Sequence, residues 1–329
     1  MSTLQLSTDD LSKYVLLVLY ILTGTLSNFG AIDILAPQWI YLGTINIISC
    51  LYFLVISPKV LDTAFKPFFN SAFLYIYLFY FVWNALSYFY AINPVETLIN
   101  LPRLGNTFFA IFFCFFLIYN LPSKFYFISR LILFFLLAEL VAYYIDFANV
   151  YPKEGLRVID IKGFAGNKNI TAASIAFKLP FVLYLLHSVQ KKFIRFGLML
   201  VLFCGALAVS LIEARAAILS SLLVLFFFLA FQMYLITVKS LTIKKGLFSI
   251  CITALPYLIA LVVNVGITSI AKKGAITDTV GRISFTEESS NGRFNYWGDA
   301  LNYVKKNPLF ASGLGNWKIA SISEGKEHI

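Results

Sequence analysis

Residues 195–238 read RFGLMLVLFCGALAVSLIEARAAILSSLLVLFFFLAFQMYLITV, and this stretch decides the fold class of the chain. It holds two apolar runs, 195–213 and 216–238. Each run is close to the roughly 20 residues that a helix needs to cross the hydrocarbon core of a bilayer. Only a very short charged segment, with Glu213 and Arg215, interrupts them. The stretch therefore predicts two transmembrane helices joined by a tight turn.

The same pattern continues along most of the 329 residues. Hydrophobic residues make up 60% of the chain and charged residues 13%, whereas a typical soluble domain has about 25% charged residues. A water-soluble fold is therefore excluded, and we predict an all-α, polytopic helical membrane protein. The nine expected spans are 14–32, 38–56, 71–91, 104–121, 126–148, 169–189, 195–213, 216–238 and 247–271.

The formal net charge of +10 does not indicate nucleic-acid binding. The basic residues lie in the loops between spans rather than in one stripe, so we expect membrane lipids as partners and no nucleic acid. Lysine and arginine are more frequent in the segments that are inside when the N-terminus is cytoplasmic. This bias predicts a cytoplasmic N-terminus and an extracytoplasmic segment after residue 271.

The polar segment after the last span is interpreted separately. We divide the chain into a transmembrane helical bundle, residues 1–271, and an extracytoplasmic loop segment, residues 272–329. Residues 294–306, FNYWGDALNYVKK, have helical spacing of apolar residues and predict an amphipathic helix on the membrane surface or over the bundle. The run ASGLGN, residues 311–316, predicts a glycine turn. We expect a loop that continues past residue 329, and hence a chain truncated at its C-terminal end.

Glu213, Arg215 and Lys178 are charged residues within or between apolar runs, where charges are costly unless they contact protein, water or a ligand. Glu213 and Arg215 are therefore candidate functional residues. The alternative is that Arg215 extends to the interface or pairs with Glu213 in a hairpin. Lys178 lies inside the sixth expected span, and a substrate pathway and a structural pair are equally compatible with it.

The expected outer loop 149–170 is unusually basic for that side of the membrane. Arg157 and Lys168 are candidate ligands for a phosphate group, because the helix that follows presents free N–H groups and the positive end of its dipole. Asn167 is placed to cap that helix. The alternative is a solvated basic loop with a capping asparagine.

A third candidate cluster surrounds Asn291-Gly292-Arg293, with Arg282 earlier in the chain and Trp297 one turn later. Guanidinium groups bind phosphate oxygens in a bidentate fork. The cluster therefore suits a lipid-linked pyrophosphate. Alternatively, an arginine near a tryptophan anchors a helix at the headgroups.

Several common catalytic motifs are missing from the sequence. It contains no GxSxG, P-loop or HExxH motif, and no spaced pair of aspartates on the expected outer side, so we expect a metal-free reaction without a cofactor. Of the two histidines, His187 lies at the inner end of a span beside a basic loop and is interpreted as structural or interfacial. His328 is a candidate general base, against the alternative of a solvated residue in a polar tail.

These residues resemble a known family. Arg215 at the start of a span, GFAGNKNITAASIAFKLP at 163–180 and NGRFNYWGDALNYVKKNPLFASGLGNWK at 291–318 are similar to the O-antigen ligase and O-antigen polymerase superfamily of bacterial envelope enzymes. Arg215 and Arg293 match the arginines of the family in place and context, and Arg282 matches less well. The serine that precedes the first of these arginines in the family is Ala214 here.

The resemblance implies a glycosyltransferase of the bacterial inner membrane that takes a glycan from undecaprenyl pyrophosphate on the outer face. It implies pyrophosphate-binding arginines and a histidine base in the long outer loop, to which His328 is the nearest candidate. A ligase transfers the glycan to lipid A–core sugar or to a protein, whereas a polymerase transfers it to another lipid-linked repeat. A transporter or flippase of an anionic or lipid-linked substrate is the alternative of another class.

Overall fold

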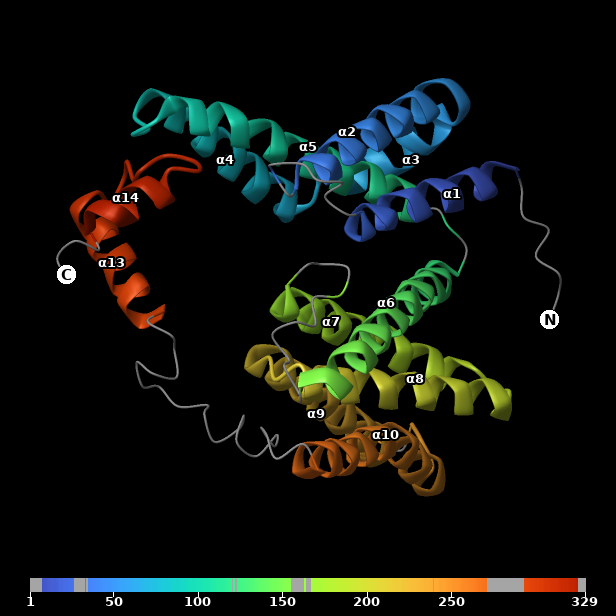
Figure 1. Cartoon of the computed structure of the whole chain (residues 1–329). Helices are drawn as coiled ribbons and strands as arrows, with labels where there is room; N and C mark the ends of the chain where they lie inside the picture. Colours follow the sequence, from blue (N-terminus) through green and yellow to red (C-terminus); the bar gives the residue numbers. More distant parts are fainter. Residues whose placement is uncertain are drawn as a thin grey trace. The chain divides into compact units, whose positions relative to one another are not determined.

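The computed structural model describes residues 8–26, 33, 35–119, 121, 123–154, 163, 167–238, 240–270 and 293–324, with only the backbone path at 8, 9, 150–154, 269, 270, 293, 323 and 324. Every regular element in these ranges is helical (Figure 1). Two compact units are present: Met1–Pro122 with Ser284–Ile329, called unit 1, and Ser123–Ile283, called unit 2. The predicted all-α membrane fold is confirmed.

Eight helical runs in the described part of the chain are long and apolar enough to cross a membrane. They correspond to the second through ninth expected spans. The first expected span, 14–32, falls partly on residues outside the described ranges, and its described part is the 15-residue helix α1, Thr8–Leu22. The side of the membrane that each loop faces stays a prediction.

Unit 1 combines helices from both ends of the sequence (Figure 1). Besides α1 it contains α2 Ala36–Leu51, α3 Pro58–Phe69, α4 Ala72–Leu86, α5 Pro94–Tyr119, α13 Arg293–Lys306 and α14 Trp317–Glu324. Short helical turns follow three of these helices, namely η1 Thr23–Thr25, η2 Tyr52–Ile56 and η3 Ser87–Phe89.

Aromatic stacking and buried amides hold the N-terminal helices of unit 1 together. The ring of Phe53 stacks on Phe113 with centroids 5.9 Å apart, and Phe68 meets Phe116 at 5.8 Å. These contacts join η2 and α3 to α5. Nearby, the Asn46 amide donates to the carbonyl oxygen of Asn106 at 3.0 Å and so fixes α2 on α5.

Two features of unit 1 were not predicted from hydropathy. The segment 58–69, expected to be a loop, forms α3, because its apolar residues recur at helical spacing and bury Val60, Ala64 and Phe68. Helix α5 begins at Pro94, well before the expected span start at residue 104. Proline suits the first turn of a helix because its missing N–H has no partner there.

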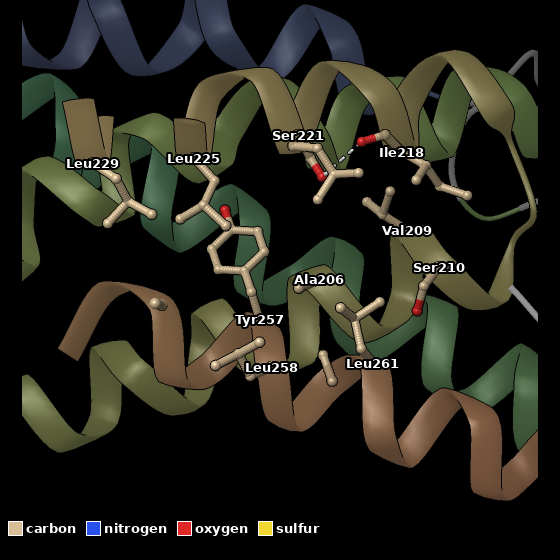
Figure 2. Close-up of a pocket in the computed structure, with 13 residues that line it drawn as sticks. Ala206, Val209, Ser210, Ile218, Ser221, Leu225, Leu229, Tyr257, Leu258 and Leu261 are labelled. Atoms are coloured by element: carbon tan, nitrogen blue, oxygen red, sulfur yellow. Dashed lines mark hydrogen bonds between the residues drawn. The ribbon is translucent and has the colours of Figure 1, made fainter. Parts of the chain in front are cut away.

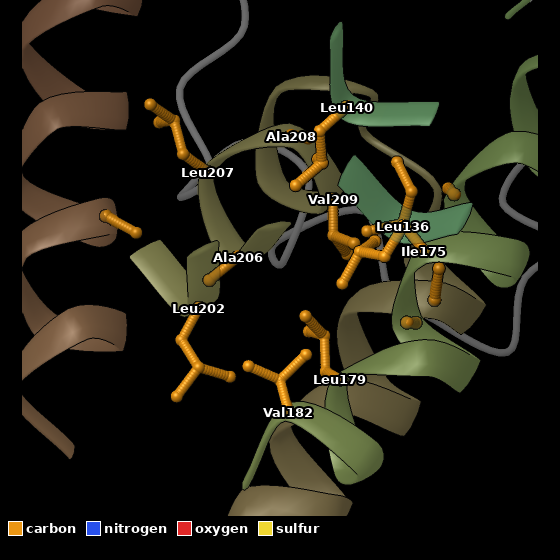
Figure 3. Close-up of a cluster of buried hydrophobic side chains, with 14 of the residues drawn as sticks. Leu136, Leu140, Ile175, Leu179, Val182, Leu202, Ala206, Leu207, Ala208 and Val209 are labelled. Atoms are coloured by element: carbon orange, nitrogen blue, oxygen red, sulfur yellow. The ribbon is translucent and has the colours of Figure 1, made fainter. Parts of the chain in front are cut away.

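Unit 2 is a bundle of long helices. They are α6 Lys124–Glu154, α7 Lys168–Ser188, α8 Lys192–Leu211, α9 Arg215–Thr237 and α10 Ile243–Ile270. Figure 3 shows side chains of α6, α7 and α8 converging, among them Leu136, Leu179 and Leu202, which are fully buried. At Gly205, an added Cβ would lie 2.6 Å from the Leu179 side chain. A larger residue at this position would therefore have to displace the end of the Leu179 side chain, which packs here between α7 and α8.

Candidate functional site

The charged turn between α8 and α9 is built by three residues, Ile212 to Ala214. Glu213 has a φ of +58°, a left-handed conformation that is uncommon for residues other than glycine. Arg215 is the first residue of α9 and is half-buried. The turn therefore holds a guanidinium at the start of an apolar helix, as the sequence predicts.

The start of α7 lies at the same end of unit 2 as Arg215. Because α7, α8 and α9 are joined by three-residue connections, successive helices are antiparallel, and α7 and α9 run in the same direction. Lys168 is the first residue of α7. The side chain of Asn167 accepts a hydrogen bond from the backbone N–H of Asn169 at 2.9 Å, which confirms the predicted cap. Two of the predicted cations are thus brought to one end.

An apolar cavity of about 430 Å³ lies between α8, α9 and α10, close to this charged turn (Figure 2). Its wall includes Ile218, which lies one turn after Arg215, and continues to Leu229 in the middle of α9. The volume falls within the range of small-molecule sites. The cavity therefore offers apolar surface that begins one helical turn from Arg215.

The few polar groups in this cavity do not change its apolar character. The hydroxyls of Ser210 and Ser221 donate to carbonyl oxygens of their own helices, at 2.8 and 3.3 Å. The buried hydroxyl of Tyr257 has no hydrogen-bond partner among the described residues. This hydroxyl is drawn toward Leu225 in Figure 2.

Lys178 forms a structural pair, one of the two roles that the sequence left open. Its ammonium group lies 2.6 Å from the Glu139 carboxylate of α6 and also contacts the Ser174 hydroxyl. Helix α7 continues through Pro180 without a break. The pair joins α6 to α7, so the charge is compensated inside unit 2.

His187 also has a structural environment, as predicted. One ring nitrogen lies 2.9 Å from the Thr253 hydroxyl, and the other lies 3.1 Å from the Ser249 hydroxyl. The ring also packs on Phe228, with centroids 4.9 Å apart. These contacts join α7 to α9 and α10.

The predicted amphipathic helix of the tail is confirmed as α13. Trp297 is exposed on this helix and packs edge-on against Phe294, with centroids 5.5 Å apart. Arg293 opens the helix, but its side chain is not among those described. The roles predicted for Arg293 and Trp297 at a pyrophosphate site stay predictions.

Four candidate residues lie outside the described ranges: Arg157, Arg282, Gly292 and His328. Within the described ranges, no group of three or more histidine, cysteine, aspartate or glutamate residues is arranged to hold a metal ion.

The glycine turn near the end of the tail packs on residues 87–100, a contact that the sequence did not predict. Asn316 is fully buried, and its side-chain oxygen accepts from the backbone N–H of Asn93 at 2.8 Å. Its amide group donates back to the Asn93 carbonyl oxygen at 3.2 Å. The backbone N–H of Leu314 donates to the Ser87 hydroxyl at 3.0 Å. These bonds attach the tail to the start of α5.

Both glycines of this turn are required by its geometry. Gly313 and Gly315 have φ values of +87° and +78°, which glycine adopts without steric cost. An added Cβ at Gly313 would lie 2.6 Å from the Cβ of Ala91. The GLGN sequence is therefore a turn that docks on residues 87–100. The hydropathy of that segment does not identify it as the partner of the turn.

The fold and these features define a polytopic helical membrane protein with an arginine one helical turn from the lining of an apolar cavity. Residues 198–328 match the family model described as O-antigen ligase. The matched segment begins in α8 and contains Arg215, Arg293 and the GLGN turn, so the match supports the O-antigen ligase superfamily membership that the sequence resemblance implies. The comparisons found no matching curated protein and no matching solved structure.

Proposed function

We propose that this protein is an O-antigen ligase-type glycosyltransferase that takes a glycan from undecaprenyl pyrophosphate and transfers it to an acceptor hydroxyl. The observation that carries the proposal is the position of Arg215. It opens α9 beside the apolar cavity and lies in the segment that matches the O-antigen ligase family. A donor with an anionic head and a long apolar chain needs these two surfaces next to each other.

In the proposed reaction, the oxygen of the acceptor hydroxyl forms a bond to the anomeric carbon of the donor. The bond from that carbon to the pyrophosphate oxygen breaks, and undecaprenyl pyrophosphate leaves. Arg215, with Lys168 at the same end of unit 2, stabilises the negative charge on the leaving group, an effect that is stronger in a partly dehydrated site. A base accepts the hydroxyl proton, and His328 is the candidate in this sequence.

Arg293, Arg282 and Arg157 are further proposed ligands of the pyrophosphate, with Gly292 and Trp297 setting the direction of Arg293. The proposed location is the bacterial inner membrane, with a cytoplasmic N-terminus and the long loop in the periplasm. The proposed acceptors are lipid A–core sugar, a protein or another glycan, the last being the polymerase reaction.

The proposal is tested by replacing Arg215 and measuring both binding of undecaprenyl pyrophosphate and glycan transfer by the protein in membranes. Arg215→Ala is expected to lower transfer by at least about a hundredfold, in the range seen when a charge-stabilising donor is removed. Arg215→Lys is expected to recover little, because a lysine lacks the bidentate fork.

Arg130→Ala is the matched control, because it removes an exposed guanidinium from the same unit. Arg130 donates to the Tyr126 hydroxyl of its own helix at 2.8 Å. Normal transfer by a well-expressed Arg215→Ala variant would refute the donor-binding role. Transfer of a small anion across the membrane by the intact protein, with no glycan product, would support the transporter alternative instead.

A further inference from the structure

A second cavity, of about 400 Å³, lies within unit 1 where the GLGN turn meets the start of α5. Its polar wall comes from three separate parts of the chain. Helix α5 contributes Glu96, Asn100 and Arg103, α14 contributes Lys318, and Asp33 precedes α2. None of these residues has a role in the proposed donor site, which lies in unit 2.

The α5 residues of this cavity share one face of the helix. Glu96, Asn100 and Arg103 have spacings of four and three residues, which stack side chains on one side of an α-helix. Ile99 adds an apolar surface between them and is half exposed. The wall thus presents a row of polar groups with an apolar patch.

The charges of the cavity are balanced. The Lys318 ammonium lies 2.8 Å from the Glu96 carboxylate, and the Arg103 guanidinium contacts the Asp33 carboxylate. Two cations are therefore paired with two anions, and an ionic ligand of either sign would have to compete with an existing partner. A neutral ligand with several hydroxyls meets no such competition.

The same groups retain hydrogen-bonding capacity for a ligand. A guanidinium and an ammonium group each have more N–H donors than one carboxylate contact uses, and a carboxylate has further lone pairs. Lys318 remains about two-thirds exposed and Arg103 about one-third exposed at the side chain. The cavity therefore offers both donors and acceptors, which suits hydroxyl groups because each can donate and accept.

Gly315 closes one side of the cavity with backbone alone. An added Cβ at this position would lie 2.4 Å from the Asn100 amide nitrogen. The Asn316 and Asn93 hydrogen bonds hold this turn on α5. The cavity is thus formed before a ligand arrives, which lowers the entropic cost of binding.

We propose that this cavity binds a sugar ring through its hydroxyl groups, with Ile99 against the C–H face of the ring. This inference rests on the proposed function, because it assigns the sugar to the glycan that the enzyme handles. The ring can come from two sources, the donor glycan or the acceptor glycan. Both offer the same pyranose hydroxyls.

The test uses the full chain in lipid nanodiscs and a panel of diazirine-bearing methyl glycosides of glucose, galactose, mannose and N-acetylglucosamine. Crosslinked peptides are mapped by mass spectrometry. At least one glycoside is expected to label residues 94–103 or 314–318. Lys318→Gln is expected to reduce that labelling by about tenfold, as loss of a charge-assisted hydrogen bond implies.

Lys305→Gln is the matched control, because it makes the same change on exposed α13 away from the cavity lining. Labelling by no glycoside of the panel, or equal labelling of the Lys318→Gln and Lys305→Gln variants, would overturn the proposal. Displacement of the probe by millimolar inorganic phosphate would also overturn it, because the cavity would then be an anion site.

Competition by undecaprenyl pyrophosphate-linked N-acetylglucosamine distinguishes the two sources. If it competes far better than the matching methyl glycoside, the bound sugar belongs to the donor. Equal competition by both compounds assigns the cavity to the acceptor. The methyl glycosides should label the Arg215→Ala variant as strongly as the parent protein. Loss of glycan transfer in Arg215→Ala therefore reports on the donor site alone, and loss of labelling reports on the sugar site alone.

Discussion

Two joints in this molecule, one in each unit, are held by different forces. In unit 2, α7 packs on α8 through buried leucines and on α6 through the Lys178–Glu139 pair. In unit 1, the GLGN turn is attached to α5 mainly by hydrogen bonds between amides, hydroxyls and backbone groups. The apolar contact in unit 2 is destabilised by any charge that has no partner. The hydrogen-bonded contact in unit 1 depends on the backbone geometry of the GLGN turn.

The largest effect is expected when the ion pair of unit 2 is broken on one side. Glu139→Ala leaves the Lys178 ammonium without its carboxylate, and removing one partner of a buried pair costs about 3–5 kcal/mol. Unfolding of the protein in mixed micelles by increasing SDS measures this loss. The double variant Glu139→Leu with Lys178→Met is expected to recover most of the stability, because neither charge is then buried. A Glu139→Ala variant as stable as the parent would show that the pair contributes nothing to the joint.

A smaller and more local effect is expected at the joint of unit 1. In Gly313→Ala the new methyl group collides with Ala91, and the positive φ is unfavourable for alanine. Overpacking of this kind costs about 1–3 kcal/mol. The amides of Ile92 and Asn93 then lose Ser312 and Asn316 as acceptors. Hydrogen–deuterium exchange should rise in residues 90–97 and stay unchanged in α7 and α8. Unchanged exchange at Ile92 would contradict the docking.

The smallest effect, of opposite sign, is expected at Gly298 in the interior of α13. An added Cβ there meets nothing within 4 Å. Gly298→Ala should therefore raise the helix stability by about 0.5–1 kcal/mol through backbone entropy alone. SDS titration and exchange of the α13 amides measure it, and this variant is also the matched control for Gly313→Ala. A loss of stability at Gly298 comparable to that at Gly313 would mean that glycine content, rather than the docking geometry, explains both results.

The sequence by itself determined the fold class and most of the spans. Long apolar runs such as 195–213 and 216–238 can satisfy their backbone groups in lipid only as helices, so composition and length suffice. Capping chemistry is equally local, which is why Asn167 was predicted correctly. The charges at Glu213, Arg215 and Lys178 were recognised as exceptional because their cost depends only on burial in an apolar run.

The tertiary structure alone decided which distant residues meet. Glu139, like Lys178, is a charge inside an apolar run and could have been singled out from the sequence, but only the folded chain shows that the two residues pair between α6 and α7. The start of α5 looked like a loop between spans, because the partners of Asn93, Glu96 and Thr97 lie more than 200 residues later, in the GLGN turn and α14. Local hydropathy predicts whether a helix is stable in lipid or in water. Polar contacts and cavities depend instead on which residues, distant in sequence, meet in the folded chain.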